Sequence, residues 1–363
     1  MKKNSLFCLI AMVACCFVGC SKQSNSTSQS VATPSAQEAN ATAAATSSSE
    51  VDYTKGPKIT IKIAHVSQAG VPIDVASNEI GKILEEKTGG RITAKVFPNS
   101  VLGNNTELME QLQAGTLEMA ISSVAFLGSF TNSTKLLDLP YLFKNNAAAE
   151  EILDGPVGQH IFSELESSGF HGLAWLSTGW RHLTANKEIH KPEDMKGLKI
   201  RVMENQMHID HFNALGASAI PMAFSELYTA LQNGTMDAEE NPFANINGSR
   251  LYEVQKYIIK TGHIYDTSPL LASSSWWNTL SASDQDLIQG VVTEALAKER
   301  ELSYSNEAEL EEKIGHNGSN VVITLSDAER DAFKKAAQPV YDKYGPQIGE
   351  DQLKLVEEVN AKH

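Results

Sequence analysis

Two arginines are the strongest candidates for ligand chemistry in this sequence of 363 residues: Arg181 in the segment STGWRHL and Arg201 in GLKIRV. The apolar residues of LKIRV alternate with Lys199 and Arg201, so the two basic side chains share one face of a predicted strand. A guanidinium fixed on a strand beside a cleft can grip a carboxylate through two parallel hydrogen bonds, each worth about 1.5–3 kcal/mol. The competing interpretation is an exposed surface ion pair worth about 0–1 kcal/mol, and these residues alone leave both open.

The charge of the chain limits its partners. The formal net charge is −14, and residues 59–363 alone carry −16. A chain this acidic does not attract anions at long range, so a grip on an anionic ligand must act locally. Nucleic acid is excluded as a partner, because its phosphates require a basic surface.

The sequence carries none of the common hydrolase or kinase signatures, and all four cysteines lie within the first 20 residues. His208 and His211, three apart on a predicted helix, offer two metal ligands, but no third ligand lies near them in the sequence. We interpret them as part of a solvated helix face. Glu239 and Glu240 are adjacent on a predicted strand and point to opposite faces, so they do not form an acid–base pair. We predict a protein that is not an enzyme and uses no cofactor or metal.

The N-terminus predicts export. Lys2 and Lys3 precede an apolar stretch, residues 6–18, that is too short to span a bilayer. The segment FVGC, residues 17–20, resembles the bacterial lipobox, with Phe17 in the place of the usual leucine. We therefore predict a lipoprotein signal peptide over residues 1–20, with lipidation at Cys20; a plain signal peptide cut elsewhere is the alternative. Residues 21–57 are rich in Ser, Thr and Ala and predict a flexible tether.

From residue 59 the hydrophobic pattern alternates between strand and helix periods. Strands are predicted over 59–66, 91–97, 117–122 and 198–202. Helices are predicted over 75–87 and 204–215, after Asn104 in capping-box spacing with Glu107, and after a cap at Ser225. Two long helical patterns follow, over 282–314 and 326–344. This succession predicts an α/β protein of two lobes with mostly parallel sheets and long C-terminal helices.

Residues 59–280 resemble the DctP-type solute-binding subunits of tripartite ATP-independent periplasmic (TRAP) transporters. The segments that carry the resemblance are long, ordered and evenly spread: GGRITAKVFPNSVLG (89–103), ELMEQLQAGTLEMAI (107–121), LPYLF (139–143), PEDMKGLKIRV (192–202), LGASAIPMAFSELYTALQNGTMDAEENP (215–242) and EVQKYIIKTGHI (253–264). The resemblance implies a two-lobed periplasmic-binding-protein-like fold that closes around an organic acid. We predict lobe I over 58–178 with a return segment near 267–306, and lobe II over 179–266 with the C-terminal helices near 307–363.

The resemblance also implies a set of binding residues. It assigns the grip on the ligand carboxylate to Arg201, a partnering hydrogen bond to Asn241, a second contact to Arg181 and an apolar wall to Phe224. In the first lobe, contacts are expected by position. The candidates, which are equally open to an ordinary structural reading, are His65, Gln68, Asn105 and Ser123.

Three departures from the family pattern bear on the ligand. The segment RHLTANK has Ala185 between Thr184 and Asn186, where many relatives have an adjacent Thr-Asn pair. Ser123 and Phe126 stand where relatives that bind sialic acid have Glu and Arg. Both changes argue against sialic acid and favour a C4-dicarboxylate or a sugar acid such as a uronate.

We predict that the protein binds this acid outside the cytoplasm, in the periplasm or at the cell surface, held to a membrane through Cys20. It delivers the ligand to the permease subunits of a TRAP transporter. Three alternatives stay open at this point. They are a co-receptor that presents its ligand to a sensor kinase, a metal-dependent enzyme with a site at His208 and His211, and the binding protein of an ATP-driven importer.

Overall fold

The computed structural model describes residues 51–363. The predicted signal peptide, Cys20 and most of the predicted tether lie outside the described residues. Within residues 51–363, no helix combines the length and the hydrophobicity that a membrane span requires.

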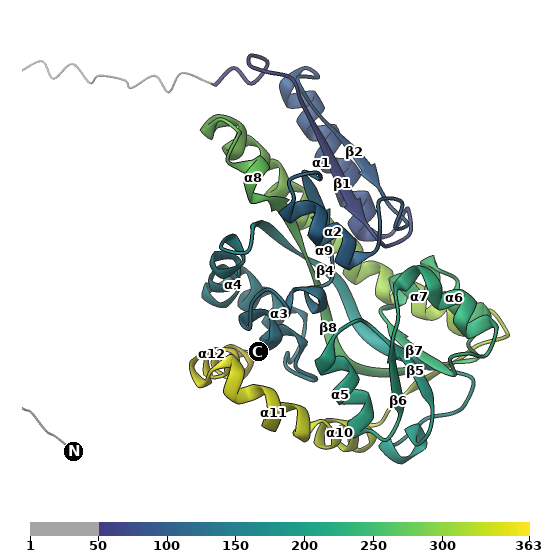
Figure 1. The fold of residues 1–363 in the computed structure, drawn as a ribbon. Helices are drawn as coiled ribbons and strands as arrows, with labels where there is room; N and C mark the ends of the chain where they lie inside the picture. Colours follow the sequence, from purple (N-terminus) through teal and green to yellow (C-terminus); the bar gives the residue numbers. More distant parts are fainter. Residues whose placement is uncertain (1–50) are drawn as a thin grey trace, which may run out of the picture. The chain divides into compact units, whose positions relative to one another are not determined.

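Nine strands form one sheet in the order β2-β1-β3-β8-β4-β7-β5-β6, with β9 paired to β8 (Figure 1). The pairs β1–β2, β1–β3, β5–β6, β5–β7 and β8–β9 are parallel, and the pairs that involve β4 with β7 or β8, and β3 with β8, are antiparallel. The strands are β1 (Ile59–His65), β2 (Ile92–Phe97), β3 (Met119–Ile121), β4 (Phe170–Ala185), β5 (Lys199–Val202), β6 (Ser218–Pro221), β7 (Ala238–Asn241), β8 (Tyr257–Ser273) and β9 (Val321–Thr324).

The two long strands β4 and β8 connect two groups of short parallel strands. β3 pairs with β8 only over residues 270–272, and β7 pairs with β4 only over residues 182–185. The groups β2-β1-β3 and β7-β5-β6 therefore lie toward opposite ends of one long antiparallel pair. The β4–β8 register shifts between Gly172 and Ala174, between Ser177 and Gly179 and between Arg181 and Leu183. Such irregularities bend strands locally, so this pair is suited to join the lobes of the two-lobed α/β fold.

Helices cover the sheet and close separate hydrophobic cores. Ile63 of β1 packs in one core with helices α1 and α9, while Ile200 of β5 packs in another with α5 and α10. The 34-residue helix α9 reaches a third core at Ile314. The α-helices are α1 (Pro72–Thr88), α2 (Asn105–Gln113), α3 (Asn146–Asp154), α4 (Pro156–Glu166), α5 (Gln206–Ala214), α6 (Phe224–Gln232), α7 (Phe243–Gly248), α8 (Ser274–Trp277), α9 (Ala282–Gly315), α10 (Asp327–Ala336), α11 (Gln338–Ile348) and α12 (Glu350–Lys362); the 3-10 helices are η1 (Val124–Leu127), η2 (Ser133–Asp138), η3 (Pro192–Met195) and η4 (Leu251–Glu253).

The helix signals in the sequence hold in most places. Asn104 and Glu107 form the predicted capping box at the start of α2. The predicted cap at Ser225 is wrong, because α6 already begins at Phe224 and follows Ala223 without a side-chain cap. The pattern over 326–344 is not one helix: α10 ends at Ala336, and α11 begins with a proline in its first turn. Proline has no amide hydrogen for a continuing helix, so the chain restarts there.

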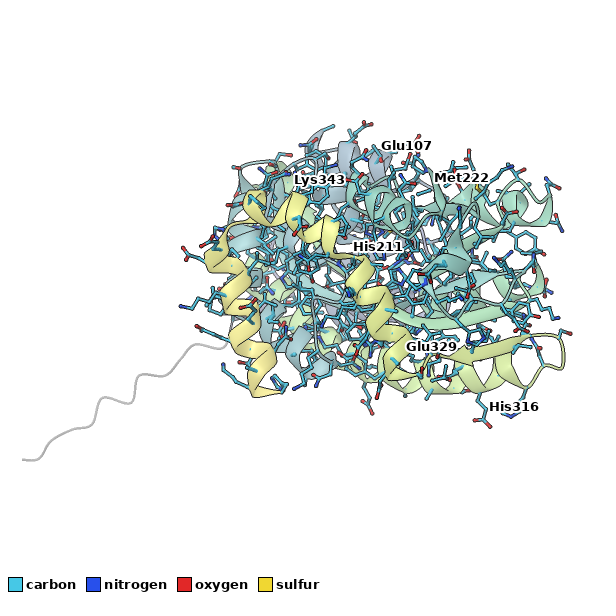
Figure 2. The ribbon with its side chains drawn as sticks, turned by 90° about the horizontal axis from the view of Figure 1, so that it is seen from below. Glu107, His211, Met222, His316, Glu329 and Lys343 are labelled. Carbon is cyan, nitrogen blue, oxygen red and sulfur yellow. The ribbon has the colours of Figure 1, made fainter. Side chains whose placement is uncertain are left out.

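The C-terminal helices α10, α11 and α12 run across one face of the molecule, near the helix that carries His211 (Figure 2). Helix α11 is fixed to α5 through Asp210, whose carboxylate accepts hydrogen bonds from Lys343 Nζ at 2.5 Å and Tyr344 Oη at 2.7 Å. The end of the chain therefore packs against α5.

Candidate functional site

A cavity of about 430 Å³, part of it open to solvent, lies where the two groups of strands approach one another. We call it the central cavity. Its residues come from the ends of β1, β3, β5 and β7, from the middle of β4 and β8, and from the starts of α2, α6 and α7. They are Val66, Ser67, Ile73, Asn105, Ile121, Ser122, Ser123, Thr178, Arg181, Arg201, Met203, Phe224, Asn241, Asn245, Asp266 and Ser268.

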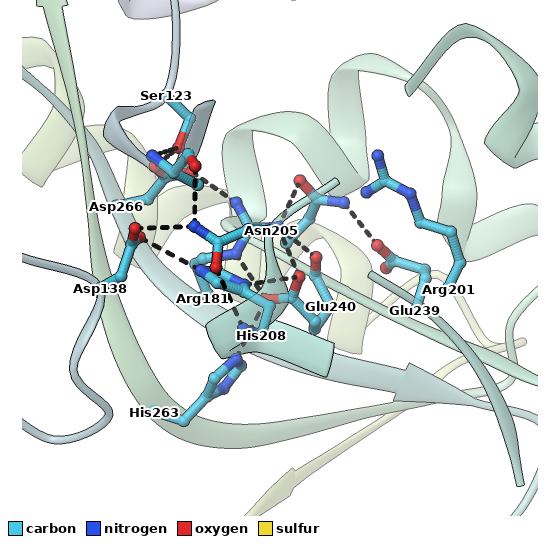
Figure 3. Close-up of polar contacts among 12 residues, drawn as sticks. Ser123, Asp138, Arg181, Arg201, Asn205, His208, Glu239, Glu240, His263 and Asp266 are labelled. Atoms are coloured by element: carbon cyan, nitrogen blue, oxygen red, sulfur yellow. Dashed lines mark hydrogen bonds and ion pairs between the residues drawn. The ribbon is translucent and has the colours of Figure 1, made fainter. Parts of the chain in front are cut away.

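Arg201 brings a buried positive charge to this cavity. Its side chain is 1% exposed, and its Nε and Nη2 atoms both donate to the carbonyl of Met222, at 2.9 and 2.7 Å. Among the described residues, no carboxylate lies within 4.0 Å of the guanidinium, and Nη1 makes no hydrogen bond. In Figure 3 no dashed line joins Arg201 to another of the residues drawn. Burial lowers the pKa of Arg201 to about 10, because the charges of Glu240 and Glu239 offset only part of the lost hydration and the charge of Arg181 adds to the lowering.

Phe224 lies beside Arg201, with the guanidinium carbon 5.9 Å from the centre of the ring. The pair combines a hydrogen-bonding fork with an apolar surface. This is the arrangement expected for a carboxylate attached to a carbon chain.

Arg181 is also buried, but the protein neutralises it. Its Nε and Nη2 atoms donate to the two carboxylate oxygens of Glu240 at 2.5 and 2.9 Å, and Nη1 donates to Asp266 at 2.5 Å. Burial raises the pKa of Glu240, but the charge of Arg181 and a hydrogen bond from His263 outweigh burial and hold it below its ordinary value. For Asp266 burial prevails over Arg181 and Ser123, and its pKa lies above the ordinary value.

The amide of Asn241 connects the cavity to a second buried acid. Its Nδ2 donates to Glu239 at 2.5 Å, and its Oδ1 accepts from Asn245 at 3.3 Å. Thr184 donates a further hydrogen bond to Glu239 at 2.8 Å. Burial raises the pKa of Glu239 to about 7, even though these hydrogen bonds oppose it. The two glutamates do face apart, as predicted from the strand, and each serves a different partner.

Six of the eight predicted binding residues line the central cavity. These are Asn105, Ser123, Arg181, Arg201, Phe224 and Asn241. His65 and Gln68 do not line it. His65 is buried, with its Nε2 atom 3.2 Å from Asp74, and Gln68 packs beside Gly248.

Among the residues that the sequence did not single out, Asp266 is the most informative. It lies in the middle of β8, and no sequence motif marks it, because only the pairing of β8 with β4 brings it to Arg181.

The interpretation of His208 and His211 as a solvated face is wrong. His208 is fully buried, with Nε2 3.2 Å from Asp138. His211 is 1% exposed, stacks on His263 with ring centres 5.7 Å apart, and has no hydrogen-bond partner on either nitrogen within the described part of the chain. Residues 51–363 contain no group of three or more His, Cys, Asp or Glu side chains placed to hold a metal ion. The metal-dependent alternative has no support in this geometry.

This combination of a two-lobed fold and a buried arginine in a cavity between two groups of strands is typical of extracytoplasmic solute-binding proteins. The chain matches the DctP family, "Bacterial extracellular solute-binding protein, family 7", over residues 63–347. It belongs to this family, whose members are solute-binding proteins of TRAP transporters and not enzymes.

Relatives and solved structures agree with this family assignment. A solute-binding protein of Verminephrobacter eiseniae is 35% identical over 300 residues, which cover 82% of this chain and 88% of that protein. The 2,3-diketo-L-gulonate-binding periplasmic protein YiaO of Escherichia coli is 33% identical, covering 78% and 87%. A TRAP solute-binding protein of Shewanella oneidensis with bound succinate has a TM-score of 0.81 at 28% identity, covering 84% and 99%. The sugar acid binding protein of Advenella mimigardefordensis with galactonate has a TM-score of 0.81 at 31% identity, covering 85% and 99%. Similar proteins therefore bind small organic acids.

Proposed function

We propose that this protein captures a small organic acid by docking its carboxylate on Arg201 in the central cavity, and that closure of its lobes presents the loaded protein to a TRAP permease. The observation that carries the proposal is the buried guanidinium of Arg201, which forms no ion pair with a carboxylate in the described chain. A buried charge without a counter-charge is costly, so an anionic ligand gains from supplying it. Asn241 and Phe224 complete the first contact shell, and Arg181 has one Nη1 hydrogen left to offer.

The lobes that close are those with boundaries near residues 178 and 266, as the sequence predicts. Contacts between them support a closed form. Asn205 at the start of α5 donates to the carbonyl of Ala125 at 2.7 Å and to Asp138 at 2.9 Å. Ser123 donates to Asp266 at 2.8 Å. A ligand shifts such an equilibrium only through contacts that it makes better in the closed form, and a ligand between Arg201 and Ser123 meets this condition.

The test is titration calorimetry with purified protein against succinate, galactonate and galacturonate. At least one acid is expected to bind. Arg201→Lys keeps the charge but loses the two-pronged fork, so the affinity should fall at least about tenfold. In Arg201→Gln, which also loses the charge, the affinity should fall further. Arg250→Gln is the matched control, because Arg250 is exposed and paired only with Glu253. Unchanged affinity in both Arg201 variants would refute the assignment.

Export and anchoring are part of the proposal. The lipobox-like segment ending at Cys20 supports a diacylated or triacylated form held at a membrane surface. Metabolic labelling with a palmitate analogue in the native host tests it: Cys20→Ala should lose both the label and the membrane association. Labelling that survives the substitution would overturn the anchor while leaving the ligand site untouched.

A further inference from the structure

The charges around the central cavity favour a ligand with one carboxylate. Only three charged side chains line it: Arg181, Arg201 and Asp266. Arg181 already faces two carboxylates, those of Glu240 and Asp266. Of the two lining arginines, Arg201 is thus the one without a direct carboxylate partner among the described residues. A second ligand carboxylate would enter this desolvated space without a cation to receive it, and burial of an unpaired charge is strongly unfavourable.

Asp266 acts against a second carboxylate directly and in favour of hydroxyl groups. Its Oδ1 atom accepts from Ser123 at 2.8 Å and its Oδ2 atom accepts from Arg181 at 2.5 Å, and the residue is only 3% exposed. A carboxylate has about four lone-pair sites, so two remain to accept hydrogen bonds. A ligand hydroxyl can donate to them, whereas a ligand carboxylate is repelled by the like charge.

The rest of the polar lining also suits hydroxyl groups. Beyond Arg201 it consists of hydroxyl and amide side chains, which both donate and accept. Thr178 and Ser268 lie 2.9 Å apart on β4 and β8, and Ser122 donates to Asn105 at 2.9 Å. Such groups match a chain of ligand hydroxyls that donate and accept hydrogen bonds in turn. Because they are neutral, they do not offset the second negative charge of a dianion.

We infer that the ligand is a hydroxylated monocarboxylate, of the aldonate or uronate class, and that Asp266 is the residue that selects it over a C4-dicarboxylate. This inference rests on the proposed function, because Arg201 must hold the single carboxylate. The relatives do not decide the matter, since solved members bind succinate in one case and galactonate in another.

The experiment compares dissociation constants for galactonate, galacturonate, succinate and butyrate by calorimetry. One of the two sugar acids should bind at least about tenfold more tightly than succinate. The same sugar acid should also bind at least about tenfold more tightly than butyrate, which has one carboxylate and no hydroxyl. Asp266→Asn removes the repelling charge and releases Arg181 from one partner. This substitution should lower the affinity for the sugar acid at least about tenfold and shift the preference toward succinate. Asp286→Asn, on an exposed position of α9, is the matched control and should change neither value.

Ser123→Ala keeps every charge and serves if Asp266→Asn fails to fold. It removes one hydrogen-bond partner of Asp266, so the affinity for the sugar acid should fall severalfold while the affinity for succinate is unchanged. Tighter binding of succinate than of both sugar acids, or equal losses for both classes in the variants, would overturn the inference while the proposed function stands. Binding of any acid that survives Arg201→Gln would instead overturn the proposed function itself.

Discussion

Replacing Arg201 with methionine should stabilise the ligand-free protein while it abolishes ligand binding. Burial lowers the pKa of Arg201 from 12.5 to about 10, and a shift of this size corresponds to about 3 kcal/mol against the charged form in the folded state. Methionine removes that cost, but it leaves the carbonyl of Met222 without its two donors, which costs about 1–2 kcal/mol. The expected net gain is about 1–2 kcal/mol, or a rise in Tm of roughly 2–4 °C.

The matched variant is Arg181→Met, for which the opposite sign is expected. Removing Arg181 leaves Glu240 and Asp266 buried without their cation, and breaking a buried pair in this way costs about 3–5 kcal/mol. Thermal and urea unfolding at pH 7.5, after co-purified ligand has been removed by partial unfolding and dialysis, measures both variants. If Arg201→Met loses as much stability as Arg181→Met, the guanidinium of Arg201 has a protein counter-charge after all, and the reasoning about the site is refuted.

Three other predictions follow from buried polar groups. A bound carboxylate near Glu239, whose pKa burial raises to about 7, favours its neutral form, so affinity should fall as pH rises from 7 to 8.5; calorimetry should find proton uptake on binding at pH 7.5 that Glu239→Gln abolishes, and its persistence would contradict the role. Burial raises the pKa of Glu299 to about 8, so the stability that this carboxyl contributes at pH 4.5 is lost as pH rises to 8; Glu299→Gln should recover up to about 4 kcal/mol at pH 8 relative to pH 4.5, and parallel unfolding curves for variant and parent would refute this. Asn205→Ala should weaken ligand binding severalfold and increase the radius of gyration in X-ray scattering, whereas Asn145→Ala, which removes only the cap of α3, should lower stability by about 1 kcal/mol without either effect; equal behaviour of the two variants would count against a closing contact.

Local patterns in the sequence were sufficient where the cause of the structure is local. The alternation in LKIRV placed Arg201 on β5, and the spacing of Asn104 and Glu107 placed the start of α2. The length of β4 and β8 escaped prediction because their residues are buried on both faces, so the period of two that marks a half-exposed strand is missing.

The parts of the site that depend on distant pairing could not be seen in the sequence. Asp266 meets Arg181 only through the β4–β8 register, and Glu240 meets it only through the β4–β7 register. His211 looked solvated because its partner in the fold, His263 of β8, lies more than 50 residues later in the chain. The sequence therefore singled out two arginines that line the central cavity, but not which of them forms ion pairs within the protein.

The difference between the two arginines explains how an acidic protein can select an anion. The overall charge of −14 gives no attraction at long range, so selection must act locally, at Arg201, which has no ion-pair partner among the described residues. Arg181 is paired with Glu240 and Asp266, so it links β4 to β7 and β8 and forms part of the wall of the central cavity. Arg201 bears the cost of burial alone, and a carboxylate that relieves this cost stabilises the folded protein by the same amount by which it binds. At a ligand concentration of 100 times the Kd this amounts to about 2.7 kcal/mol. Under the proposed function, stability lost at Arg201 in the free protein is recovered as affinity, and with Asp266 as the proposed selector the same few residues would determine both how tightly an acid binds and which acid it is.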